Sequence, residues 1–436
     1  MTTAGDTEPQ ALSNRSRRPG RSGAIMWLLA VAATAGLVCW CYLLGQSSHE
    51  GVDFGYFLAA ARNVAAGHSP YLGQPNYVYP PLLAIVLAPV SHANPHSLWD
   101  IWTVVVIAAA LLGAITFVVH HRRAVTRSIR PAFLIFCVAT VLSCWPMRRE
   151  LELGQSDTFV FLTLVLAAVA ADRPKPGRRG AWIGFAGLIK GWPALIGVTL
   201  LAPLTNLTRN RRQIPTTELT AFALVLLIAP LLALITGGAS GVSALVKNGL
   251  DAPQPSDLVN DSVWGAPKLL FSHTGLAHPL LISTAAQIAV TALLATWVAT
   301  LLIISLGPTR DPSLALWNTI FCLILLLPIA HRQYALYVLP LLWIAVLRVL
   351  SPGNRDRRQL ATVAVLAGWW IIQTLTWPYS GSSPSISAIR YTIPFFADLA
   401  ACTVTVTANR RRTTLQPTSI AESAANPGLA RIPESV

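Results

Sequence analysis

Residues 24–44 read AIMWLLAVAATAGLVCWCYLL and form the first long apolar stretch of the chain. Its length matches the roughly 20 residues that an α-helix needs to cross the hydrocarbon core of a membrane. It exceeds the about 7–15 residues of a signal-peptide core. The segment before it, residues 15–21, is rich in arginine. Because positive charge is retained in the cytoplasm, the stretch predicts a signal anchor with a cytoplasmic N-terminus.

The whole chain has the composition of an integral membrane protein. Hydrophobic residues make up 53% of the 436 residues and charged residues 11%, whereas soluble proteins carry about 25% charged residues. We expect one all-α polytopic membrane domain over residues 24–408. Residues 1–23 and 409–436 are polar and have little apolar surface to bury, so we expect both cytoplasmic ends to be disordered.

The net charge of +14 comes from arginines in short clusters between apolar stretches, such as Arg122-Arg123 and Arg357-Arg358. This pattern is typical of cytoplasmic loops that meet anionic lipid, and we prefer it over nucleic-acid binding. The six cysteines lie in apolar stretches without the spacing of a zinc site. They are interpreted as small buried hydrophobic residues rather than as disulfides or metal ligands.

The alternating basic clusters predict about twelve crossings with both termini in the cytoplasm. Residues 49–94 and 237–279, and the connection 148–157, are then external. Two amphipathic stretches, Phe54–Ala66 and Pro81–Val90, are too short to span and are expected as surface helices. Residues 181–204 are broken by Lys190-Gly191-Trp192-Pro193, which predicts a hairpin of two short helices with Lys190 at the outer apex. Further spans are expected near Leu98–Val119, Pro131–Cys144, Thr158–Ala171, Leu219–Thr236, Leu281–Leu306, Leu314–Leu327, Tyr334–Leu350, Ala361–Trp377 and Tyr391–Thr407.

Asp53 stands out among the polar residues because it follows the first apolar stretch directly, in the sequence GVDFGY of residues 51–56. It could be a general base at the membrane surface, or it could simply cap the next helix, since Asp is a favoured N-cap. Lys190 and the pair His331-Arg332 are flanked by apolar runs, so each is a site candidate by default. Glu150 and Glu152 could support a metal ion, but they are interpreted as solvated loop acids.

The order of several motifs resembles a known family. These motifs are Asp53 with Tyr56, Gly67 with Tyr71, Tyr79-Pro80-Pro81, Ala88-Pro89, Gly154-Gln155, Lys190 with Pro193, Asn260-Asp261-Ser262-Val263-Trp264-Gly265, and His331 with Tyr334. The sequence is similar over residues 50–345 to the actinobacterial membrane glycosyltransferases that use polyprenyl-phosphate sugars. That family comprises mannosyltransferases of phosphatidylinositol mannoside and lipomannan synthesis and a branching arabinofuranosyltransferase. One departure is visible, because Gly191-Trp192 separates Lys190 from Pro193 where many relatives have Pro almost directly after Lys.

The resemblance implies the C-type glycosyltransferase bundle and gives Asp53 the role of catalytic base. The expected contacts to the donor phosphate are Lys190, His331, Arg332, Arg148 and Arg149. The residues expected to bind substrate are Tyr56, Tyr71, Tyr79, Gln155, Asn260, Asp261 and Tyr334.

We therefore expect an enzyme that transfers a sugar from polyprenyl phosphate to a glycolipid, lipoglycan or polysaccharide acceptor, and mannose is the preferred sugar. Transfer would occur on the outer face of the plasma membrane, and it would invert the configuration at the anomeric carbon. The leaving phosphate tolerates negative charge, so neither a metal nor a cofactor is expected. The partners are the lipid-linked donor, the acceptor and membrane lipids. The alternatives are an arabinofuranosyltransferase, a transporter or flippase for a lipid-linked sugar, and an envelope scaffold.

Overall fold

The computed structural model describes residues 21–47, 51–172, 175–201, 216–250, 260–274, 277–307, 311–351, 356–375 and 388–414. This part of the chain is helical apart from its connections. Its elements are α1 (Arg21–Gln46), α2 (Val52–Ala65), α3 (Leu82–Leu87), η1 (Ala88–Val90), α4 (Pro95–His120), α5 (Arg130–Leu142), α6 (Trp145–Leu153), α7 (Asp157–Ala171), α8 (Arg178–Lys190), η2 (Trp192–Leu200), α9 (Thr216–Leu226), α10 (Ile228–Leu250), α11 (Gly265–Phe271), α12 (Thr284–Leu306), α13 (Pro312–Leu326), η4 (Arg332–Val338), α14 (Leu339–Leu350), α15 (Arg357–Thr374) and α16 (Ala388–Thr414).

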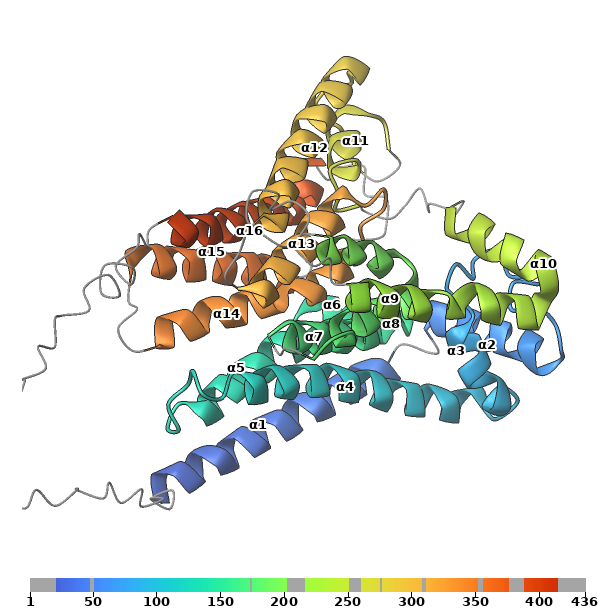
Figure 1. Cartoon of the computed structure of the whole chain (residues 1–436), viewed down its shortest axis with the longest axis horizontal. Helices are drawn as coiled ribbons and strands as arrows, with labels where there is room; N and C mark the ends of the chain where they lie inside the picture. The colour runs from blue at the N-terminus through green and yellow to red at the C-terminus, as the bar shows by residue number, and fades with distance from the viewer. Residues whose placement is uncertain are drawn as a thin grey trace, which may run out of the picture.

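In the view of Figure 1, α1, α4, α5, α14, α15 and α16 run roughly along one direction, whereas α12 runs across it, and α16 ends at one end of this group. The start of α1, the connection from α4 to α5 and the facing ends of α14 and α15 lie there, on the left of the view. Helices α2 and α3 lie at the opposite end, beside the bend of α10. The basic connection from α4 to α5 and the basic start of α15 therefore lie at the other end of the bundle from the candidate catalytic segment.

Six helices in the described part of the chain are long and apolar enough to cross a membrane, or seven if the bent pair α5 and α6 forms one span. Exposed apolar side chains on α1, such as Leu28 and Leu43, are 70% and 60% accessible, as expected for lipid contact. These observations confirm an all-α polytopic membrane protein. The twelve crossings, the surface position of α2 and α3, and the orientation stay predictions.

Several sequence-based expectations are visible as structure. Helices α2 and α3 occupy the two predicted amphipathic stretches, and the run around Lys190 is the hairpin of α8 and η2 with its turn at Gly191. The six cysteines are all free thiols, and five of them are buried. Helices α1 and α16 extend to Arg21 and Thr414, while the rest of the two predicted tails lies outside the described residues.

Two segments differ from the expectation. The connection 148–157 is not an open loop, because α6 occupies most of it. Helix α10 continues well past Thr236, bends at Gly238 and ends at Leu250. Both segments are polar enough to read as loops. Helix α6 packs against the bundle through buried Met147, Glu150 and Leu151, whereas most of α10 past Thr236 is exposed or half-buried.

Local signals explain where other helices begin. The Asn94 side chain accepts a hydrogen bond from the His96 N–H at 2.9 Å, and Pro95 follows at the first helical position of α4. Asp311 caps α13 in the same way through the Leu314 N–H at 2.9 Å. Such caps satisfy N–H groups that have no partner within the helix.

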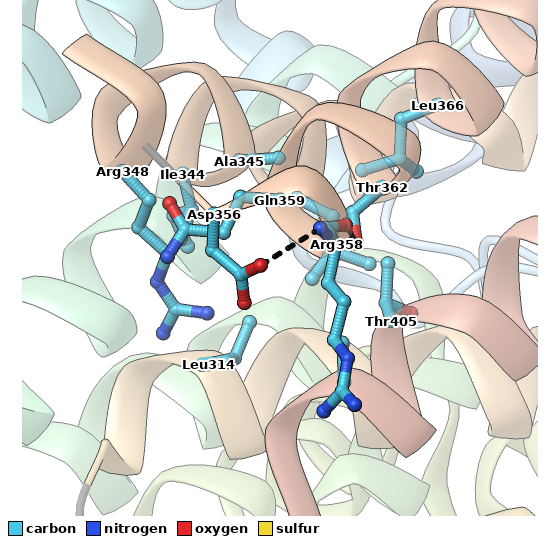
Figure 2. A pocket seen from close by; sticks show the side chains of 12 residues that line it. Leu314, Ile344, Ala345, Arg348, Asp356, Arg358, Gln359, Thr362, Leu366 and Thr405 are labelled. Atoms are coloured by element: carbon cyan, nitrogen blue, oxygen red, sulfur yellow. Dashed lines mark hydrogen bonds between the residues drawn. The ribbon is translucent and has the colours of Figure 1, made fainter. Parts of the chain in front are cut away.

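A cavity of about 120 Å³ lies among α13, α14, α15 and α16, where α14 meets α15 (Figure 2). Arg348 at its edge pairs with Asp311 at 2.9 Å, and Asp356 accepts a hydrogen bond from the backbone N–H of Arg358 at 3.2 Å. Arg348 is therefore paired through its guanidinium, whereas Arg358 contacts Asp356 through its backbone, as the helix cap of α15.

Candidate active site

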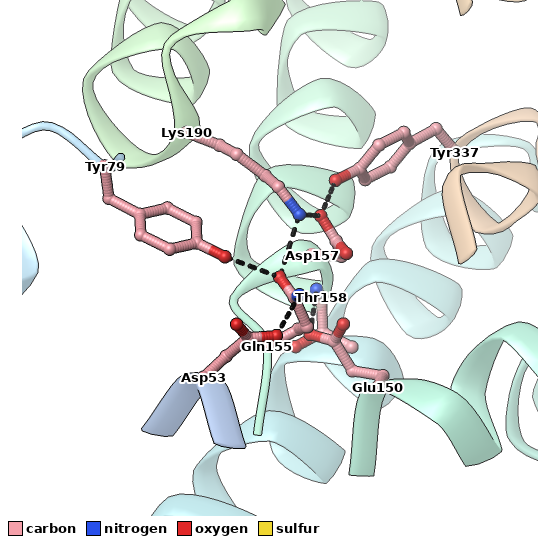
Figure 3. Close-up of polar contacts among 8 residues, drawn as sticks. All are labelled: Asp53, Tyr79, Glu150, Gln155, Asp157, Thr158, Lys190 and Tyr337. Carbon is pink, nitrogen blue, oxygen red and sulfur yellow. Dashed lines mark hydrogen bonds and ion pairs between the residues drawn. The ribbon is translucent and has the colours of Figure 1, made fainter. Parts of the chain in front are cut away.

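Asp53 lies in the first turn of α2, one residue inside the helix start. The N-cap is Gly51, which makes no side-chain cap bond, so Asp53 is not the helix cap. Its Oδ2 atom instead accepts a hydrogen bond from the Nε2 of Gln155 (Figure 3). The carboxylate is thus directed at a residue more than a hundred positions away in the chain.

Gly154 explains why Gln155 reaches Asp53. It ends α6 in the left-handed region, with φ of 71°, where glycine carries no steric penalty. A Cβ at this position would come within 2.6 Å of the Phe54 Cβ and 2.7 Å of the Trp99 ring. The missing side chain therefore allows the start of α2 to approach the end of α6.

Gln155 joins two further segments at the same point. Its Oε1 accepts hydrogen bonds from the Tyr79 hydroxyl and from Lys190 Nζ, both at 3.0 Å. Tyr79 precedes α3, and Lys190 is the last residue of α8. The amide therefore holds the predicted base, the Tyr-Pro-Pro motif and the hairpin apex together.

Lys190 also forms an ion pair with Asp157, and the Tyr337 hydroxyl donates to the same carboxylate (Figure 3). The Lys190 side chain is 6% exposed and that of Asp157 is fully buried. The Tyr334 ring centre lies 4.9 Å from Lys190 Nζ, within the range of a cation–π contact. Trp192, one residue past the apex glycine, packs on Tyr334 and Tyr337.

Glu150 is fully buried, so its interpretation as a solvated loop acid is wrong. Its Oε1 accepts the backbone N–H of Thr158 at 3.0 Å, at the start of α7. Glu152 lies partly exposed on the same helix and pairs with Arg148 at 2.7 Å and with Arg149 at 3.1 Å. One face of α6 thus points into the site and the other toward its rim.

The surroundings of the site raise the pKa of Asp53 and lower the pKa of His331. Burial raises the pKa of Asp53 to about 6, while the charge of Lys190 opposes the rise and that of Asp157 adds to it. Burial, helped by the charge of Lys190, lowers the pKa of His331 to about 4. At neutral pH the carboxylate is therefore ionised and the imidazole is neutral.

Arg332 points away from this cluster. Its guanidinium donates to Gln373 at 2.9 Å and to the carbonyls of Ile372 and Leu375 at 2.7 and 3.1 Å, at the end of α15. It also lies 4.9 Å from the Trp145 ring centre. These contacts tie the start of η4 to α15.

The other expected substrate residues lie at the edges of the cluster. Tyr71 donates to the Tyr79 carbonyl at 3.0 Å, and Tyr56 accepts from Asn76 at 3.1 Å. Asn260 and Asp261 pair with the loop before His331: the Asn260 side chain donates to the Pro328 carbonyl at 2.7 Å, and the Asp261 N–H donates to the Ala330 carbonyl at 2.8 Å. These two residues thus fix the loop that carries His331.

An apolar cavity of about 580 Å³ opens next to the cluster. Phe54, beside Asp53, and Ile189, beside Lys190, are both part of its wall, and the rest comes from α3, η1, α4, α7 and α8. Asp53 and Lys190 are not among the lining residues, but each is adjacent in the chain to one that is. The apolar space suits a hydrocarbon chain.

The sequence marked Asp157 only as one of several polar residues on the predicted outer face and gave no role to Tyr337 or Trp192. Asp157 follows Gln155 by two positions, and Tyr337 follows Tyr334 by three, which places the two tyrosines on one helical face. The three-residue spacing of the tyrosines could have identified Tyr337 as a neighbour of Tyr334. The pairing of Asp157 with Tyr337 joins residues 180 positions apart, and no local pattern reveals it.

No curated protein matches the sequence. A family model described as glycosyltransferase family 87 matches residues 77–328, more than half of the chain. The match covers Tyr79, Gln155, Asp157 and Lys190 but begins after Asp53. It agrees with the expected glycosyltransferase activity and with the helices that can span a membrane. The chain belongs to glycosyltransferase family 87.

Proposed function

We propose that this protein transfers a sugar from polyprenyl phosphate to a hydroxyl group of a glycolipid or lipoglycan on the outer face of the plasma membrane. Mannose is the sugar that we assign, and arabinofuranose is the alternative. The observation that carries the proposal is that Gln155 links Asp53 to the buried Lys190–Asp157 pair, while Phe54, next to Asp53, lines an apolar cavity. A lipid-linked donor needs an apolar space for its tail, a cation near its phosphate and a base near its anomeric carbon. These requirements coincide at this one place.

In the proposed reaction, Asp53 removes the proton from the acceptor hydroxyl as the oxygen attacks the anomeric carbon. The new glycosidic bond forms as the bond to the phosphate oxygen breaks, so the configuration inverts and polyprenyl phosphate leaves. With a pKa of about 6, Asp53 is ionised at neutral pH and still basic enough to accept the proton.

Two cations are suitably placed for the phosphate. Lys190 lies at the centre of the cluster but is almost fully buried, whereas the Arg149 side chain is 24% exposed. A guanidinium has several donors in a fixed fork, so Arg149 can keep its bond to Glu152 and still bind phosphate. We therefore propose that Lys190 and Arg149 stabilise the leaving group, and that Arg148 adds charge at the rim.

The other predicted residues receive supporting roles. Neutral His331 would act as a hydrogen-bond partner of donor or acceptor, and Arg332 would hold the loop rather than touch phosphate, because its guanidinium is engaged with α15. Tyr79, Gln155 and Tyr334 would line the sugar site, while Tyr56, Tyr71, Asn260 and Asp261 would shape its edges. We propose no metal and no cofactor for this reaction.

The test is transfer by the purified protein in lipid nanodiscs, with polyprenyl-phosphate mannose and polyprenyl-phosphate arabinofuranose offered separately. Glycolipid acceptors extracted from a deletion strain are used, and products are identified by mass spectrometry and by NMR of the anomeric linkage. We expect one inverted product from the mannose donor. Transfer from the arabinose donor alone would change the sugar assignment, and no transfer from either would overturn the proposal.

A further inference from the structure

The cluster around Lys190 contains more acids than bases. Asp53, Glu150 and Asp157 all lie there, and Lys190 is hydrogen-bonded within the cluster. The charge of Arg149 also reaches Asp53, but Arg149 is paired with Glu152 at 3.1 Å. Three ionised carboxylates beside one ammonium would leave two uncompensated negative charges in a largely buried place. Buried charges without partners are costly and tend to be neutralised by a proton.

The contacts of Glu150 and Asp157 show where a proton is needed. Each side chain has one carboxylate oxygen that is buried and meets no donor, namely Oε2 of Glu150 and Oδ2 of Asp157. Glu150 Oε1 accepts a hydrogen bond from the backbone N–H of Thr158, the residue next to Asp157, so the two carboxyl groups lie close together. An ionised carboxylate can only accept, so a contact between them is favourable only if one of the two acids carries a proton.

The remaining partners indicate which acid holds it. Asp157 Oδ1 accepts from both Lys190 and Tyr337, and both contacts favour its ionised form. Glu150 Oε1 receives one neutral backbone N–H, from Thr158. Resting on the proposed function, we propose that Glu150 is protonated in the resting enzyme, donates its Oε2–H to Asp157 and is thereby a positioning residue for Lys190.

A protonated Glu150 completes a continuous chain of hydrogen bonds. The Thr158 N–H donates to Glu150, Glu150 to Asp157, and Lys190 to both Asp157 and Gln155, while Gln155 donates to Asp53. The titratable groups facing this chain from other elements are Tyr79, Tyr334, Tyr337 and His331. The charge of Arg149 acts on the Asp53 end of the chain. An ionised Glu150 would disturb Lys190 and repel the donor phosphate.

Three substitutions separate a protonated from an ionised Glu150. Glu150→Gln mimics the neutral acid, since its carbonyl can accept from Thr158 and its NH₂ can donate to Asp157, so kcat/KM should stay near the parent value. Glu150→Ala leaves two buried groups without partners and should lower kcat/KM by about 10- to 100-fold. Glu150→Asp displaces the carboxyl and should cost around 10²-fold. Glu218→Gln on α9 makes the same chemical change outside the site and is the matched control.

Infrared spectroscopy supplies a readout that does not need turnover. In protein labelled with ¹³C at the glutamate carboxyl, we expect a protonated-carboxyl band that shifts in D₂O, is absent from Glu150→Gln and persists in Glu218→Gln. The unsubstituted protein is sufficient for the first observation if Glu150→Gln does not fold. This result would stand even if neither polyprenyl donor were used.

Two outcomes would overturn the inference. One is the absence of the labelled protonated-carboxyl band at neutral pH in the unsubstituted protein. The other is a loss of kcat/KM in folded Glu150→Gln as large as that in Glu150→Ala. If a bound cation balances the charge in place of the proton, EDTA treatment of the unsubstituted protein would lower activity and the band would be missing.

Discussion

Removing the charge of Lys190 should destabilise the fold strongly, because its ion pair with Asp157 is buried. The two side chains are 6% and 0% exposed, so Lys190→Met leaves the Asp157 carboxylate in the interior without its cation. Breaking a buried pair from one side costs roughly 3–5 kcal/mol. We expect the free energy of unfolding to fall by about that amount.

The partner substitution should restore much of the loss. Asp157→Asn removes the stranded charge while keeping a group that Tyr337 can contact. The double variant Lys190→Met/Asp157→Asn should therefore be more stable than Lys190→Met alone, and the double-mutant cycle should give a coupling of about 1–3 kcal/mol. All variants should transfer sugar poorly, because each alters the charge at the proposed phosphate site.

Unfolding is measured by denaturant titration in mixed detergent micelles, followed by tryptophan fluorescence. Lys268→Met, an exposed lysine on α11, is the matched control and should change stability by less than about 0.5 kcal/mol. If Lys190→Met unfolds at the parental denaturant concentration, the two charges do not act as a buried pair, and the reasoning about this cluster is refuted.

Three further predictions concern pH, packing and orientation. The value of kcat/KM should be level above pH 6 and fall about tenfold per pH unit below it, because Asp53, with a pKa of about 6, must be ionised to act; a profile without this limb would contradict the role. Gly51→Ala would place a Cβ 2.3 Å from the Leu153 carbonyl carbon, so α2 must shift, and kcat should fall by up to around 10²-fold. Gly55→Ala, which meets nothing within 4 Å, should keep the parental kcat, and equal rates for the two variants would show that the α2 position is not critical. In a Cys39→Ala background, His68→Cys should react with an impermeant maleimide on intact cells; labelling only after permeabilisation would invert the orientation.

The hydropathy pattern was sufficient to predict those helices that depend on local sequence. The first helix, the two short helices after it and the hairpin at Lys190 all follow from apolar runs and from Gly and Pro, and each appears at its predicted place. Asp53 and Gln155 were singled out because their motifs resemble those of a family. Their direct contact could not be derived from the spacing of the residues.

The remaining differences come from tertiary packing. Glu150 lies among Arg148, Arg149 and Glu152, a local pattern that resembles a solvated loop, yet α6 turns Glu150 alone toward the start of α7. Arg332 is flanked by apolar residues and looked like a phosphate ligand. Its partners on α15 lie about 40 positions away, beyond the reach of any local pattern.

The central claim is that Asp53 is the base of a polyprenyl-phosphate-dependent transfer. The most direct measurement is single-turnover transfer from polyprenyl-phosphate mannose by Asp53→Asn and Asp53→Glu in nanodiscs, with donor binding and thermal stability measured on the same samples. We expect almost no transfer for Asn and roughly 10²-fold slower transfer for Glu, with both proteins folded and binding donor. Parental transfer by the Asn variant would remove Asp53 from catalysis and contradict the account.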